Sequence, residues 1–80
     1  MQPYPTTAES RYQRLQTYLK EGWSIHPPVF MNPSWSYTHH ISAAYHFILE
    51  RNSSHQLLVV PRSPKVDHFI NEKQLQLNRL

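Results

Sequence analysis

Residues 44–61 of this 80-residue chain, AYHFILERNSSHQLLVVP, decide its fold. Two apolar runs flank the polar segment 52–55, whose composition favours a turn. The second run, residues 57–60, is too short for a helix and stops at Pro61, which has no N–H group to donate to a continuing ladder. The stretch therefore predicts two antiparallel strands joined as a β-hairpin.

A helix is the alternative for the first half of this stretch. Apolar residues between positions 38 and 51 also recur at spacings of three and four residues, which fits one stripe of a helix. Against the helix, Tyr45, Phe47 and Leu49 alternate, and the second strand needs a partner across a short gap. We expect the hairpin, and a helix over residues 38–51 is the competing interpretation.

The N-terminal segment carries the signals of an amphipathic helix. Two prolines predict an irregular lead-in over residues 1–6. The sequence TTAE at residues 6–9 fits a capping box, and the apolar stripe that follows stops before Gly22, the only glycine. We expect a helix from about Thr7 to Glu21.

The segment between this helix and the hairpin is predicted to be extended. Residues 23–31 begin with an apolar and polar alternation, but Pro27 and Pro28 lack N–H groups and exclude a central strand. We expect an edge strand or a polyproline-like piece there. Residues 32–37, NPSWSY, are predicted to form a loop.

The C-terminal part predicts a second helix. Ser63 is a favoured N-cap, Pro64 a favoured first helical residue, and Asp67 suits the positive end of the helix dipole. The helix should run to about residue 75, with residues 76–80 fraying. The chain is thus expected to be one small α+β domain: an N-terminal helix, an extended edge segment, an antiparallel β-hairpin and a C-terminal helix.

Composition limits where in the cell the protein is expected and which kinds of site it can contain. The chain has no cysteine, which excludes disulfides and cysteine-based zinc sites. The N-terminus shows no signal peptide, and no apolar run reaches the roughly 20 residues of a membrane span. We expect a cytoplasmic protein without a membrane partner.

Short motifs follow one another between residues 11 and 70: YL at 18–19, GW at 22–23, PPVF at 27–30, YHFIL at 45–49, VVP at 59–61 and SP at 63–64. This pattern resembles small uncharacterised proteins of cyanobacteria. The motifs are structural rather than catalytic. The resemblance implies a cytosolic accessory protein and lends no activity.

Patterns that carry catalysis are missing from the sequence. The five acidic residues are widely spaced, no serine has the glycine-flanked elbow of a hydrolase, and one glycine cannot form a phosphate-binding loop. A chain of this size also struggles to enclose a substrate pocket. We expect no enzyme and no cofactor.

Six histidines raise the question of a metal site. His39, His40 and His46 come nearest to a metal constellation, with Glu50 as the only acid close in sequence. Adjacent histidines usually point apart. The segment therefore offers too few ligands for a metal ion and too few carboxylates to orient the histidine rings. The sequence predicts no metal site, and a histidine-based metal-binding protein is one alternative function.

Aromatic side chains in polar or edge segments point to a protein partner. Trp35 and Tyr37 lie in the predicted loop, where packing does not require them, and large aromatics of this kind are frequent interface anchors. The predicted edge adds apolar bulk. We expect a non-catalytic protein-interaction or accessory module that binds another protein or a second copy of itself. The residues expected to make the contacts are Trp35, Tyr37, Val29, Phe30 and Met31.

Nucleic acid is the other candidate partner. Trp35, Tyr37 and Tyr45 could stack on bases while Arg51 and Arg62 hold phosphates. The formal net charge is +3, but the basic residues are scattered, whereas a nucleic-acid binder usually clusters them on one face. This function stays open as an alternative.

Overall fold

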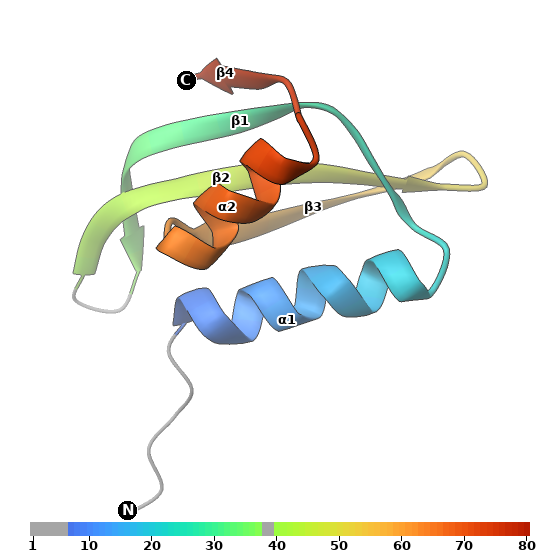
Figure 1. The fold of residues 1–80 in the computed structure, drawn as a ribbon, viewed down its shortest axis with the longest axis horizontal. Coiled ribbons are helices and arrows are strands. Elements are labelled where there is room, and N and C mark those ends of the chain that lie inside the picture. Colours follow the sequence, from blue (N-terminus) through green and yellow to red (C-terminus); the bar gives the residue numbers. More distant parts are fainter. Residues whose placement is uncertain (1–6, 38–39) are drawn as a thin grey trace, which may run out of the picture.

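The protein is a small α+β structure with two helices and a four-stranded mixed sheet (Figure 1). The computed structural model describes residues 7–37 and 40–80, with side chains for residues 8–35 and 43–80. Neither helix in these ranges is long and apolar enough to cross a membrane. The elements are α1 (Thr7–Lys20), β1 (Ser24–Tyr37), β2 (His40–Arg51), β3 (Ser54–Pro61), α2 (Pro64–Glu72) and β4 (Leu77–Arg79).

The predicted hairpin is present as β2 and β3. Their antiparallel register runs from Ala44 opposite Pro61 to Arg51 opposite Ser54. The connection is a two-residue turn at residues 52–53, shorter than the four-residue segment that composition indicated. Both turn residues have positive φ angles, 49° and 69°, which is typical of a type I′ turn. The competing helix over residues 38–51 is wrong, because the described part of this segment is strand β2.

The first helix ends where the sequence predicted. α1 stops at Lys20, and Gly22 adopts a φ of 96°, a conformation that other residues rarely adopt. Arg51, at the end of β2, donates from Nη1 to the carbonyl of Glu21 at 2.8 Å, and its guanidinium lies 5.3 Å from the ring centre of Trp23. The end of the hairpin is thereby tied to the C-terminus of α1.

The prediction of an extended segment beside the hairpin over residues 23–31 is confirmed, but its position at the sheet edge and the loop over residues 32–37 are wrong. β1 runs through both parts and lies inside the sheet, in the strand order β3-β2-β1-β4. The ladder between β1 and β2 has irregularities between His26 and Phe30 and between Asn32 and Trp35. The prolines at positions 27, 28 and 33 fall inside these irregularities, where a missing N–H group breaks no regular ladder bond.

The C-terminal helix starts as predicted and ends earlier. The Ser63 side chain accepts a hydrogen bond from the Val66 N–H group, and Pro64 opens the helix, which ends at Glu72. The prediction that residues 76–80 fray is wrong, because they include β4, which pairs parallel to β1. The amide of Val29 donates to the carbonyl of residue 76 at 2.8 Å, so these backbone bonds hold a segment whose composition gives no strand signal.

Both helices pack on one face of the sheet and share one core (Figure 1). The rings of Tyr12 in α1 and Phe69 in α2 meet edge to face with centroids 5.9 Å apart. Tyr45 reaches from β2 to α2 and donates to Asp67 Oδ1 at 2.5 Å. The buried cluster consists of Leu15, Val29, Tyr45, Phe47, Leu49, Leu58, Val60, Val66, Phe69 and Ile70.

Candidate functional site

The other face of the sheet has no described helix packed on it. In β2, the buried residues Tyr45, Phe47 and Leu49 point to the helices, so the residues between them point the opposite way. Cross-strand partners share a face, which extends this assignment to β1 and β3. We call this surface the open face. Its apolar and aromatic described residues are Phe30, Trp35, His46, Ile48, Leu57 and Val59, with the polar Ser24 and Asn32 in β1. His26, Glu50 and His55 lie at the end nearest the hairpin turn, and Ala44 and Pro61, which are fully buried, lie at the other end.

Strand β3 is apolar on both of its faces. Leu58 and Val60 are buried under the helices, while Leu57 and Val59 belong to the open face. Leu57 is 62% exposed. A strand covered on one side normally alternates apolar with polar residues, and a strand covered on both sides does not. The composition of β3 is therefore that of a strand with a second covering layer.

An aromatic pair occupies the open face between β1 and β2. The ring of Trp35 meets the imidazole of His46 edge to face, with centroids 5.1 Å apart. Burial lowers the pKa of His46, and its Nε2 atom is buried without a hydrogen-bond partner among the described residues. At neutral pH the imidazole is therefore uncharged, which keeps this part of the face apolar.

The predicted contact residues divide between the two faces. Phe30 and Trp35 lie on the open face, whereas Val29 has no exposed surface and Met31 packs against the core. The prediction that residues 29–31 form a free edge is wrong, because β4 pairs with them. Tyr37 ends β1, and its side chain lies outside the described part.

Sequence reasoning did not single out the aliphatic residues of this surface, Ile48, Leu57 and Val59. Their apolar character was visible, but none of them was given a role in binding. The run of four apolar residues at positions 57–60 was the available signal, because a strand of this kind has apolar side chains on both faces. Which face the helices would leave open was not readable from the run.

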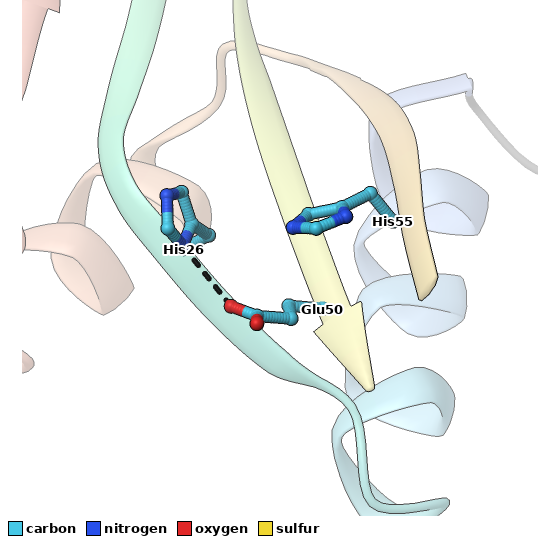
Figure 2. Close-up of side chains that lie close together, drawn as sticks. All are labelled: His26, Glu50 and His55. Carbon is cyan, nitrogen blue, oxygen red and sulfur yellow. Dashed lines mark hydrogen bonds and ion pairs between the residues drawn. The ribbon is translucent and has the colours of Figure 1, made fainter. Parts of the chain in front are cut away.

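The histidines proposed as metal candidates are only partly described. His39 and the side chain of His40 lie outside the described part, and His46 is packed against Trp35. Two other histidines do come together, at one end of the open face (Figure 2). His26 and His55 flank Glu50 there, with His26 Nδ1 at 3.1 Å from Glu50 Oε1.

The arginines proposed to hold phosphates are engaged within the chain. Arg62 pairs with Asp67 at 3.1 Å, and this carboxylate raises the pKa of the Arg62 guanidinium. Arg51 donates to the carbonyl of residue 21, as described above. Tyr45, proposed to stack on a base, is only 5% exposed. These contacts leave the proposed nucleic-acid residues poorly placed for a shared binding surface.

Comparison of the chain with protein-family models, with curated proteins and with solved structures gave no match. The resemblance to small cyanobacterial proteins stays a prediction.

Proposed function

We propose that this chain is a small, non-catalytic interaction module and that its open face binds a second copy of the chain. The observation that carries the proposal is the apolar character of the hairpin on both faces, although the described helices cover only one. Burying apolar surface is the main driving force for association. A second copy supplies the missing layer by the same physical effect that holds the helices on the other side.

Charge favours a second copy as the occupant. Among the described residues of the open face, Glu50 is the only carboxylate, and none is a lysine or an arginine. Two identical surfaces can meet only if like charges do not face each other across the contact. The centre around Phe30, Ile48 and Leu57 is neutral, so the face is compatible with itself.

The size of the face suits a modest dimer. β1 and β2 have 14 and 12 residues, so each spans at least about 40 Å at ~3.3 Å per residue. With neighbouring strands ~4.8 Å apart and two strands short, the projected area is on the order of 550 Å2. This is below the ~800 Å2 that each partner buries in a standard interface, so a contact through the face belongs to the small, weak class of interfaces.

The edges of the sheet are less suited to binding than the face. β4 has only three residues and offers a short edge. At the other edge, α1 lies beside β3: Arg11 Nη1 donates to the carbonyl of Val59 at 3.4 Å, and Tyr18 Oη donates to Gln56 Oε1 at 2.9 Å. Contact through the face is therefore favoured over addition of a strand at the edge.

Leu57→Lys tests the proposal, and Leu80→Lys is its matched control. The two leucines are 62% and 63% exposed, but Leu57 lies on the open face whereas Leu80 follows β4. Light scattering after size exclusion should show wild-type chain and Leu80→Lys as dimers at high concentration. Leu57→Lys should be a monomer, because each contact would bury an unpaired ammonium group.

Circular dichroism melting shows whether both variants are folded. We expect that they are, because both substitutions are at exposed positions. A wild-type chain that stays monomeric up to millimolar concentration contradicts the proposal, as does a dimer that survives Leu57→Lys. Salt separates the proposal from the nucleic-acid alternative. An apolar contact should persist in high salt, whereas binding to phosphates weakens steeply as salt rises.

A further inference from the structure

Three side chains able to ligate a metal ion converge beside the hairpin turn (Figure 2). His26 comes from β1, Glu50 from β2 and His55 from β3. The His26 and His55 rings meet edge to face with centroids 5.8 Å apart, and Glu50 Oε1 lies 3.1 Å from His26 Nδ1. One ligand atom from each residue lies within 4.8 Å of the other two. This is the one such group found among the described residues.

The pairing of the strands brings these side chains together. Glu50 and His55 are direct partners in the ladder between β2 and β3, which places their Cβ atoms ~4.5–5.5 Å apart on one face. Ser24 is the partner of Glu50 in β1, so His26 occupies the adjoining diagonal position on the same face. The type I′ turn that follows Arg51 holds this register. Backbone order is therefore already supplied before any ion binds.

The donor set suits zinc. Two imidazole nitrogens and one carboxylate oxygen occur together as zinc ligands in open sites that keep one position for water. With bonds of ~2.0–2.1 Å, neighbouring donors of a tetrahedral site lie roughly 3.3 Å apart. His26 and Glu50 have nearly this separation already. The remaining donor lies within 4.8 Å of the other two and so has to move by at most about 1.5 Å, which rotation of the exposed His55 side chain can supply.

An isolated surface ion pair would account for only part of this arrangement. It would explain the contact of His26 with Glu50, but not a second imidazole from a third strand at the same point. We propose that His26, Glu50 and His55 form a binding site for a divalent transition-metal ion of the zinc class. The ion would join three strands at one end of the open face. This site does not depend on the proposed dimer.

Zinc titration of the full chain tests the site. Calorimetry should show one Zn2+ ion per chain, and the melting temperature should rise with Zn2+ because the ion binds the folded state. His26→Ala and His55→Ala should each weaken the affinity roughly tenfold or more, and Glu50→Gln should also weaken it. His68→Ala is the matched control: His68 is an exposed histidine on α2, 4.0 Å from Glu72, and its loss should change nothing.

Two results would overturn the site. One is the absence of both binding heat and a rise in melting temperature with Zn2+. The other is a zinc response that survives His26→Ala and His55→Ala but disappears in a His39→Ala, His40→Ala double variant. Nuclear magnetic resonance of the histidine rings provides a readout independent of stability. The ring signals of residues 26 and 55 should shift together on adding Zn2+, while that of residue 68 stays in place.

Discussion

His46 is a titratable side chain in an apolar setting, packed edge to face against Trp35. Burial lowers its pKa from the ordinary value of 6.5. As the pH falls below 6.5, the unfolded chain therefore takes up this proton more readily than the folded chain, and stability decreases. The stabilising contribution is complete above that pH and is lost as the pH falls towards the lower pKa of the folded state.

His46→Phe should remove this part of the pH dependence while keeping a ring against Trp35. Urea unfolding at pH 7.5 and pH 5.5 gives the free energy of unfolding at each pH. The difference between the two values should be smaller in His46→Phe than in the wild-type chain. An unchanged difference would show that the folded protein takes up this proton as readily as the unfolded chain. His68→Ala controls for histidines on the exposed surface.

Tyr45 links the sheet to α2 through its hydroxyl, which donates to Asp67 Oδ1. Burial, and next the Asp67 carboxylate, raise the pKa of Tyr45 to about 12. Tyr45→Phe should lower the free energy of unfolding by about 1.5–3 kcal/mol at pH 8, the usual range for a hydrogen bond to a charged group. Tyr18→Phe, which removes an exposed bond to the neutral Gln56, should cost less.

The alkaline pH dependence gives the second readout for Tyr45. The raised pKa means that its contribution is complete below pH 10 and is lost as the pH rises from 10 to about 12. Tyr45→Phe should lack this loss. If the two chains unfold with equal free energies at pH 8 and lose stability in parallel above pH 10, the bond to Asp67 contributes nothing.

At the scale of elements, a substitution in the hairpin turn should increase the stability of the protein. Ser53 occupies the second turn position with a φ of 69°, where type I′ turns prefer glycine. Ser53→Gly should raise the free energy of unfolding by about 0.5–1 kcal/mol, because relief of the left-handed conformation outweighs the added freedom of the unfolded chain. Ser54→Gly, one residue later in β3, should act in the opposite direction.

Chemical unfolding of both variants shows whether each glycine raises or lowers the free energy of unfolding. Equal destabilisation by the two glycines would contradict the assignment of the turn to residues 52–53. The effect belongs to the hairpin and should be independent of the dimer, so the comparison is best made at low protein concentration.

Elements with local signals were predictable from the sequence. Gly22 marked the end of the first helix, Ser63 marked the start of the second, and the alternation in residues 45–49 identified β2. β4 carries no such signal, since three exposed residues become a strand only because β1 presents its edge to them. β1 was misjudged because Pro27 and Pro28 argued against a central strand, and the ladder accommodates them at an irregularity.

The candidate site was predictable only in part, for a similar reason. Trp35 was identified because large aromatic residues are typical of interfaces, whereas Phe30 was named as part of an edge that β4 in fact occupies. Leu57 and Val59 were not identified, because a run of apolar residues does not show which of its faces a helix will cover. His26, Glu50 and His55 are far apart in the sequence, and only the pairing of three strands brings them together.

At the scale of the whole molecule, the protein is two layers with one apolar outer surface. The helices bury one face of the sheet, and the core they form is small, as expected for 80 residues. A second copy across the open face would convert two thin cores into one thicker unit. The dimer would thereby supply the additional stabilisation that small domains without disulfides usually need.

Amide chemical-shift mapping over a dilution series from millimolar to micromolar concentration tests most directly whether two copies of the chain meet through the open face. The account predicts concentration-dependent shifts at Phe30, Ile48, Leu57 and Val59, together with constant shifts along the outer surface of α1. Shifts confined to the helices, or none across the series, would contradict the claim that the open face is where two copies meet.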